Sequence, residues 1–363
     1  MKIKGVILLG IISLFCGIPL IVKAGDVNDI IVDTISPSRL NVKGKVKLFK
    51  EFIYFAVDNN GVMQYGVMAK DSDFVIKSDY KTNKCYIFDI NGFNIQTNDY
   101  WSPTEVRSLQ KNTFQNKKLT QSNTEFRFSD GIRHSKSVYN YNEKGLITSY
   151  LLYSIYGKLS FKKLYRYDDH NNIVWEREVD GDGEIEYTTT TEYRYEGDRM
   201  IYSKENSDYV TIHKWLYDSN NRQIGSYYQW DELVWDSSFE LNGEGKKVKI
   251  TCKGANGEIK YITTFKYNDN GDIIEKKEMF SNGRHKTYTY DLEKKTYIIM
   301  TTMDGIVDKK EVYVDNNLME YYDGKNTYEY RYTFDSKGNW IKVIEEKNSI
   351  PTYIKVRTIQ YFP

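Results

Sequence analysis

The sequence contains few of the residues on which enzymes and metal proteins depend. It has four histidines and three cysteines among 363 residues. No Gly-x-Ser-x-Gly elbow, His-Glu-x-x-His pair, phosphate-binding loop or dinucleotide-binding glycine pattern occurs, which argues against the common hydrolase, metalloprotease and nucleotide-binding classes. The histidines stand far apart, so a metal site would require the fold to gather them. We therefore expect no metal, no cofactor and no catalytic residue; the four histidines are His134, His170, His213 and His285.

Neither sign of charge prevails. The chain has 51 lysines and arginines against 50 aspartates and glutamates, and no block of like charge. Nucleic acids and anionic membrane surfaces attract proteins through a basic footprint. The balance predicts that neither of them is the main partner.

The first residues match a secretory signal peptide. Lys2 and Lys4 precede an apolar run over residues 6–22, and Val22-Lys23-Ala24 has the pattern that a signal peptidase inspects. We expect a signal peptide over residues 1–24 and a linker over residues 25–39. An uncleaved anchor is the alternative, because the run is near the lower length limit for spanning a bilayer. The mature chain is expected to be secreted, periplasmic or in the cell envelope, without stable membrane insertion.

Only Cys85 and Cys252 lie outside the expected signal peptide. In an oxidising compartment they could form one disulfide. The alternative is a pair of buried or free thiols. Two cysteines are in either case too few to act as a framework for a chain of this length.

Proline is scarce, with five copies, and none occurs between Pro103 and Pro351. Because proline lacks the backbone N–H that a strand donates to its neighbour, this gap fits a continuous sheet. Residues 187–195, Tyr-Thr-Thr-Thr-Thr-Glu-Tyr-Arg-Tyr, show the β-branched and aromatic composition that favours strands. Regular β structure is therefore expected over most of the chain.

A repeated unit organises this β structure. Each copy has an aromatic-x-aromatic-Asp/Asn step, then a turn and aliphatic residues, as in Phe265-Lys266-Tyr267-Asn268 followed by Ile273-Ile274. The anchors from Tyr141 to Phe334 recur every 21 to 28 residues, a spacing typical of repeat arrays. Six anchor tyrosines share one repeat position and are expected on a common, packed face: Tyr141, Tyr167, Tyr195, Tyr217, Tyr267 and Tyr290.

Short turns separate the predicted strands. Asn-Gly or Asp-Gly pairs stand at residues 180–183, 242–243, 256–257 and 270–271, where they supply the positive φ angles of tight hairpins. Such short loops join antiparallel neighbours. The sequence therefore predicts an all-β fold, an extended antiparallel meander of tandem hairpin repeats over residues 40–363, and leaves open whether the sheet curls or closes.

One segment predicts a helix instead. Ser102-Pro103-Thr104-Glu105 has a serine suited to a helix cap, a proline suited to the first helical position and a glutamate three residues after the serine, which together match a capping box. A helix of two or three turns is expected near residues 103–112.

The repeat resembles the YD repeats of RHS-type proteins, in particular their short secreted bacterial relatives. The clearest copy is Tyr332-Thr333-Phe334-Asp335-Ser336-Lys337-Gly338-Asn339-Trp340, and the resemblance extends from about Leu40 to the C-terminus. It implies a β-meander and a life outside the cytoplasm. Large RHS proteins use such repeats to build a shell around a toxin; this chain is too short for such a shell, and we expect no toxin cargo domain in it.

The aromatic residues suggest where a ligand would bind. The chain has 33 tyrosines, 16 phenylalanines and six tryptophans, and those in the anchor positions are expected to pack. Trp101 and Trp230 fall outside that register, so they are the candidate ligand-binding residues, because an indole on a loop suits stacking on a sugar or contact with a protein.

We expect a non-enzymatic extracytoplasmic binding or scaffold protein that contacts a glycan, such as a polysaccharide, or a protein of the cell envelope. One alternative is a carbohydrate-active enzyme with two paired carboxylates, which need no sequence motif because the fold holds them. Another, implied by the resemblance alone, is a partner or immunity protein of an RHS-type toxin system.

Overall fold

The computed structural model describes residues 36, 40, 42–59, 62–69 and 83–363. The expected signal peptide and, apart from Ser36, the expected linker lie outside the described residues. The predictions of cleavage after Ala24 and of a linker over residues 25–39 are therefore not tested by the fold.

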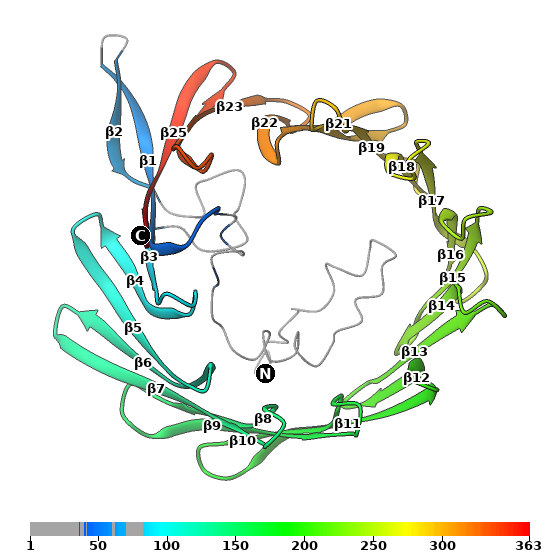
Figure 1. The fold of residues 1–363 in the computed structure, drawn as a ribbon, viewed down its shortest axis with the longest axis horizontal. Helices are drawn as coiled ribbons and strands as arrows, with labels where there is room; N and C mark the ends of the chain where they lie inside the picture. Colours follow the sequence, from blue (N-terminus) through cyan, green and yellow to red (C-terminus); the bar gives the residue numbers. More distant parts are fainter. Residues whose placement is uncertain (1–35, 37–39, 41, 60–61, 70–82) are drawn as a thin grey trace.

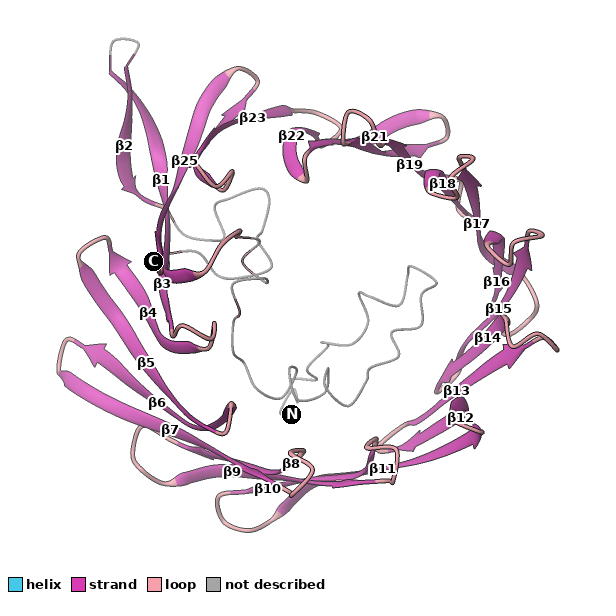
Figure 2. Cartoon of the chain, in the orientation of Figure 1, coloured by secondary structure: helices cyan, strands magenta, loops and turns pink. Residues whose placement is uncertain are grey.

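The described chain is all-β, as the repeat pattern predicts, and contains no helix (Figure 2). Every pair of neighbouring strands is antiparallel, and from β3 onward each strand pairs with the next one in the sequence. The strands are β1 (Val46–Asn59), β2 (Val62–Met68), β3 (Lys84–Phe88), β4 (Asn94–Ser102), β5 (Glu105–Gln115), β6 (Lys118–Phe128), β7 (Gly131–Tyr141), β8 (Ile147–Tyr153), β9 (Leu159–Tyr167), β10 (Ile173–Asp180), β11 (Ile185–Glu196), β12 (Arg199–Asn206), β13 (Val210–Tyr217), β14 (Gln223–Trp230), β15 (Leu233–Leu241), β16 (Lys247–Lys253), β17 (Ile259–Tyr267), β18 (Ile273–Phe280), β19 (Arg284–Asp291), β20 (Thr296–Met303), β21 (Ile306–Val314), β22 (Asn317–Tyr322), β23 (Thr327–Phe334), β24 (Trp340–Lys347) and β25 (Ile350–Tyr361).

The meander closes into a ring, which settles the question that the sequence leaves open (Figure 1). Strand β1 pairs with the last strand, β25, from Val46↔Tyr361 to Phe55↔Tyr353. Its other edge pairs with β3 over residues 48–51. Strand β2 pairs with the far end of β1, residues 54–59, so it extends one hairpin beyond the ring.

The turns divide the ring into two rims, because consecutive strands run in opposite directions. The turns that follow odd-numbered strands from β3 onward contain the Asp or Asn of the repeat, and we call their side the anchor rim. In a typical one, the Asp168 carboxylate accepts a hydrogen bond from the Asn172 N–H at 2.8 Å. Gly145 adopts a φ of +84° in the equivalent turn after β7, a conformation that favours glycine. The turns after even-numbered strands form the opposite rim.

At several places in the array, a tyrosine hydroxyl forms a hydrogen bond to a backbone carbonyl of the preceding strand. The Tyr167 hydroxyl donates a hydrogen bond to the Ile147 carbonyl at 2.6 Å, and the Tyr267 hydroxyl donates to the Lys247 carbonyl at 2.6 Å. The same bond recurs elsewhere along the array, with the tyrosine one strand beyond its acceptor. Its other copies are Tyr141 to Leu119, Tyr193 to Ile173, Tyr217 to Met200 and Tyr332 to Leu318.

The core lies in several clusters along the anchor-aromatic face. One cluster surrounds Ile147 and contains the anchor-step residues Tyr139 and Tyr165, which are buried. Another surrounds Tyr330 and Val343 near the closure of the ring. The aromatic face that the sequence predicts to be packed is thus the face on which the buried clusters form.

The helix predicted near residues 103–112 is wrong. Pro103 and Thr104 form the turn between β4 and β5, and Ser102 pairs with Glu105 across it. The φ of proline suits a turn as well as a first helical position, which is why the capping pattern was ambiguous. Strand β5 then alternates between exposed and half-buried residues, and pairing with both β4 and β6 satisfies its backbone.

Cys85 and Cys252 are free and buried. They lie in β3 and β16, which are not neighbours in the sheet. Of the two alternatives that the sequence allows, the structure shows the pair of buried thiols.

Candidate functional site

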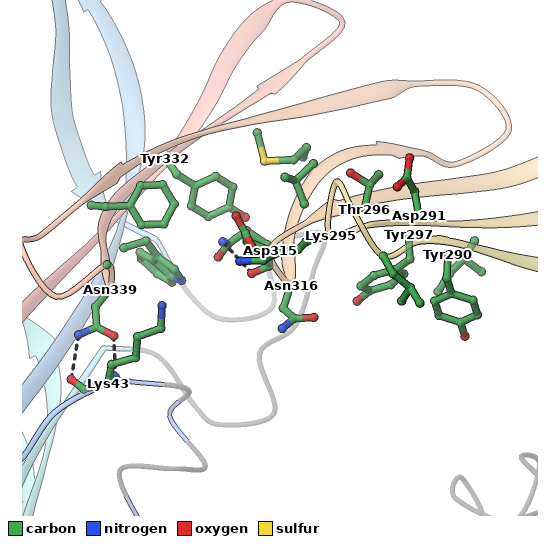
Figure 3. Close-up of a pocket in the computed structure, with 18 of the residues that line it drawn as sticks. Lys43, Tyr290, Asp291, Lys295, Thr296, Tyr297, Asp315, Asn316, Tyr332 and Asn339 are labelled. Carbon is green, nitrogen blue, oxygen red and sulfur yellow. Dashed lines mark hydrogen bonds and ion pairs between the residues drawn. The ribbon is translucent and has the colours of Figure 1, made fainter. Parts of the chain in front are cut away.

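A cavity of about 1180 Å³ lies at the anchor rim over β19–β24. Figure 3 shows Tyr290, Tyr297 and Asn316 on its wall, on the side of the ribbon that faces the centre of the ring. Its volume exceeds that of an ordinary small-molecule pocket. The lining combines aromatic, amide and charged side chains: Lys43, Tyr288, Tyr290, Asp291, Leu292, Lys295, Thr296, Tyr297, Ile299, Val314, Asp315, Asn316, Asn317, Met319, Tyr332, Phe334, Gly338, Asn339 and Trp340.

Strand register brings the aromatic side chains to one wall. Tyr290 lies directly opposite Tyr297 in the pairing of β19 with β20, and Tyr297 lies opposite Tyr313 in the pairing of β20 with β21. Because side chains alternate between the faces of a sheet, residues paired in this way share a face. Tyr332 and Phe334 are two residues apart in β23 and therefore also share a face.

The rings form a nearly continuous aromatic surface, the aromatic wall, defined here as Tyr290, Tyr297, Tyr332, Phe334 and Trp340. Tyr297 stacks on Tyr313 of the neighbouring strand, with ring centroids 4.3 Å apart and planes 9° apart. Tyr332 lies 6.0 Å from Phe334 and 6.1 Å from Trp340 between centroids. The wall residues are half-buried except Phe334, which is exposed, so a ligand can still reach ring surface.

Asn339 connects the wall to the start of the described chain. The Lys43 N–H donates to the Asn339 side-chain oxygen at 2.6 Å, and the Asn339 amide donates to the Lys43 carbonyl at 3.0 Å. The same amide donates to the Tyr361 hydroxyl at 2.6 Å. The backbone of Lys43 is therefore held in place beside the cavity, as the dashed lines in Figure 3 mark.

Each carboxylate of the cavity lining lies close to a lysine. The Asp291 carboxylate lies 3.3 Å from the Lys294 ammonium, and the Asp315 carboxylate lies 3.5 Å from the Lys295 ammonium. A hydrogen bond from the Lys294 N–H is the main cause of a lowered pKa of Asp291. Both carboxylates of the lining thus already have cationic partners.

Two tyrosines of the cavity, Tyr297 and Tyr332, have raised pKa values and are protonated at ordinary pH. Burial, and secondarily the negative charge of Glu311, raises the pKa of Tyr297. Burial also raises the pKa of Tyr332, and the positive charge of Arg357 opposes that rise only in part. These hydroxyls can therefore donate hydrogen bonds, and Tyr332 uses its own on the Leu318 carbonyl.

Carboxylates outside the cavity that are buried or partly buried are engaged in structural contacts. Glu176 accepts a hydrogen bond from the Tyr187 hydroxyl at 2.5 Å and lies 3.4 Å from the Lys163 ammonium. The buried Glu345 accepts hydrogen bonds from the hydroxyls of Tyr330 and Thr352. The Lys163 ammonium also lies 3.2 Å from the Glu178 carboxylate, so Glu176 and Glu178 share one cation.

The structure places the two predicted ligand-binding residues, Trp101 and Trp230, at the opposite rim. Trp101 is the last but one residue of β4, with 56% of its surface exposed, and the Arg107 guanidinium lies 4.5 Å from its ring centroid. Trp230 ends β14, is half-buried, and meets Tyr209 edge to face at 5.8 Å. The two tryptophans stand on different hairpins far apart in the strand order, and neither lines the cavity.

The sequence reasoning missed the cavity because most of its aromatic residues occupy anchor positions. Tyr290 and the Tyr332–Trp340 copy were assigned to packing, which is their role in the other repeats. A useful signal was available in the turn after β19, where Leu292-Glu293-Lys294-Lys295 contains neither the glycine nor the asparagine found in other turns of this rim. A second signal was the adjacent short Asp315-Asn316 turn.

No group of three or more His, Cys, Asp or Glu side chains among the described residues is arranged to hold a metal ion. Over that same part of the chain, no helix has the length and apolar character needed to cross a membrane.

Comparison with known proteins gives similarity of structure only. No protein-family model and no curated protein sequence matches the chain. It is similar to a chain of the Photorhabdus luminescens Tc holotoxin pore, with a TM-score of 0.26 and 11% identity over 74% of this chain and 18% of that one. It is also similar to the TcdB2-TccC3 crystal structure without its hypervariable C-terminal region, with a TM-score of 0.22 and 8% identity over 81% of this chain and 22% of that one.

A porin-like protein from Bacteroides uniformis is similar with a TM-score of 0.25 and 13% identity, over 66% of this chain and 96% of that one. The chain spans about a fifth of the length of the Tc toxin chains that it matches.

Proposed function

We propose that this chain is an extracytoplasmic, non-enzymatic YD-repeat protein that binds a glycan in the cavity at the anchor rim. The observation that carries the proposal is the aromatic wall beside amide groups. Sugar rings have apolar faces and hydroxyl edges, so they suit a site that offers ring surface and hydrogen-bonding side chains together. Asn316 and Asn317 supply such groups.

The carboxylates of the cavity favour binding over hydrolysis. A glycoside hydrolase needs one carboxyl that stays protonated and a second carboxylate at a defined separation from it. Asp291 has a lowered pKa and a lysine partner, and Asp315 has a lysine partner too. Neither has the environment of a general acid, so the enzymatic alternative finds less support here.

A glycan array probed with the purified mature protein tests the proposal. We expect binding to one class of polysaccharide without release of reducing sugar. Tyr290→Ala should weaken that binding about tenfold or more, because an aromatic side chain at a binding hot spot contributes about 2 kcal/mol or more. Tyr156→Ala is the matched control, since Tyr156 is 77% exposed at the opposite rim and should bind like the unchanged protein.

Trp230→Ala separates this site from the opposite rim. If the cavity binds the glycan, Trp230→Ala should bind normally and melt within a few degrees of the unchanged protein. Lost binding in Trp230→Ala with normal binding in Tyr290→Ala would move the site to the opposite rim. Release of reducing sugar would instead favour the enzymatic alternative.

A further inference from the structure

Lys43 is the one charged residue of the cavity lining whose side chain has no hydrogen-bond or ion-pair partner among the described residues. Its contacts with Asn339 use the backbone N–H and carbonyl and leave the ammonium free. In Figure 3 the side chain extends away from these bonds, between Asn339 and Asn316. Within the described part of the chain, the cavity therefore presents a cation without an acidic partner.

The backbone from which this ammonium extends is held in place beside the cavity. The Lys43 backbone is held by two hydrogen bonds to a side chain almost 300 positions later in the chain, at |i−j| = 296. The ammonium nitrogen lies 3.4 Å from the place that a Cβ atom would take at Gly338. Gly338 has a φ of +74° in the turn after β23, so the turn that carries Asn339 also leaves room for the lysine.

The aromatic wall is also longer than one sugar ring. Tyr290 and Tyr332 stand on β19 and β23, four strand spacings apart, which corresponds to about 19 Å along the rim. Lys43 and Asn339 lie at the β23–β24 end of this wall. A ligand that covers the rings and reaches the ammonium must be a chain of several sugars.

We infer that the glycan bound in the cavity is an anionic polysaccharide, with an acidic group seated on Lys43 and consecutive sugars on the aromatic wall. This inference rests on the proposed function. The lysine ammonium is a compact charge without the rigid planar donor geometry of an arginine guanidinium, so it can bind either a carboxylate or a sulfate. The other lining charges, which are paired, add no comparable preference.

Binding of three soluble polysaccharides to the mature protein tests the inference: polygalacturonate, dextran sulfate and neutral dextran. We expect tighter binding of an anionic chain than of dextran at equal sugar concentration, with the preference declining as salt rises. Comparison of the first two chains distinguishes a carboxylate from a sulfate as the favoured acidic group.

Lys43→Gln removes the charge and keeps the backbone bonds to Asn339. Its affinity for the preferred anionic chain should fall about twofold to fivefold, as for a solvent-accessible ion pair, while its affinity for dextran stays unchanged. Lys158→Gln is the matched control, because Lys158 is an exposed lysine in a turn of the opposite rim, and it should bind every chain normally.

Equal binding of the three chains, or equal losses in the two lysine variants, would overturn the anionic assignment. In that case a Tyr290→Ala variant that has lost binding would still uphold the proposed glycan site. Failure of the unchanged protein to bind any glycan on an array would overturn the proposed function and this inference together.

Discussion

At the scale of single residues, the anchor tyrosine serves two purposes. Its ring fills space on the packed face, and its hydroxyl satisfies a backbone carbonyl on the preceding strand, as Tyr267 does for Lys247. A phenylalanine would retain the first role and lose the second. The recurrence of tyrosine in the repeat therefore has a polar cause as well as an apolar one.

Substitution of Tyr267 separates these roles. Tyr267→Phe should lower the free energy of unfolding by about 1 kcal/mol, the usual net contribution of one hydrogen bond, and Tyr267→Ala by about 3 kcal/mol. Urea unfolding measures both. Lys266→Ala, on the opposite face, removes an exposed lysine from its ion pair with Glu275 and should cost less than about 1 kcal/mol; equal losses at the two positions would contradict the register.

His213 should make the free energy of unfolding depend on pH. Burial lowers its pKa from 6.5 to about 4, so the folded protein holds it neutral while the unfolded chain protonates it near 6.5. The contribution of His213 to the free energy of unfolding should therefore be fully present above about pH 6.5. It should fall by roughly 3 kcal/mol in all as the pH drops toward 4. Below that range both states are protonated and this contribution stays constant.

Urea unfolding at a series of pH values measures the effect of His213. His213→Phe should flatten the profile between pH 6.5 and 4, because the ring remains and the titration is lost. Direct NMR titration that gave His213 a pKa near 6.5 in the folded protein would refute this account.

At the scale of elements, the turns of the anchor rim show why Asp or Asn follows the aromatic step. Asp168 accepts hydrogen bonds from the Asn172 N–H at 2.8 Å and from the Tyr195 hydroxyl at 3.0 Å. Its neighbour Asp169 is exposed. One carboxylate thus closes its own turn and binds the following repeat.

Asp168→Ala should therefore lower the free energy of unfolding by about 1–3 kcal/mol, since it leaves two donors without their acceptor. Asp169→Ala should change it by less than about 0.5 kcal/mol, as for an exposed position. Thermal unfolding of the two variants side by side measures the difference. Similar stabilities would mean that the turn closes without its carboxylate.

Elements and their order could be predicted because each is encoded locally. The alternation in Phe265-Lys266-Tyr267 and the Asn-Gly pair after it specify a strand and a hairpin within a few residues. The error at Ser102–Glu105 has a local cause too, because the same four residues suit a helix start or a hairpin turn. Pairing of β5 with both neighbours decides between them, and that information lies outside the segment.

The cavity was beyond prediction for a different reason. Tyr290 and Tyr332 are the two different aromatic residues of the repeated step, both of which pack elsewhere, and only the local geometry of β19–β24 leaves their rings beside open space. The contact of Lys43 with Asn339 spans nearly the whole described chain. No local sequence pattern indicates such a contact. The prediction of Trp101 and Trp230 as ligand-binding residues depends only on their departure from the repeat register, which carries no information on where a cavity forms.

At the scale of the whole molecule, closure joins the first strand to the last. The side chain of Glu51 on β1 is 1% exposed, and its carboxylate lies 2.7 Å from the Arg357 guanidinium and 3.6 Å from the Lys355 ammonium on β25. The Arg357 guanidinium also lies 3.2 Å from the centroid of Trp340, which lines the cavity. The seam of the ring and one end of the aromatic wall therefore share a cation.

Removal of the charge at Glu51 should open this seam. Glu51→Gln would leave two buried cations facing a neutral side chain, and loss of one partner of a buried ion pair costs about 3–5 kcal/mol. Amide hydrogen exchange should accelerate first in β1 and β25, before the rest of the array, because the remaining strands keep both neighbours. Glu275→Gln is the control, since its lysine partner Lys266 is solvent-accessible and that exchange pattern should not change. Uniform acceleration of amide hydrogen exchange over all strands in Glu51→Gln would show that the ring unfolds as one unit and that the ion cluster does not stabilise the seam locally.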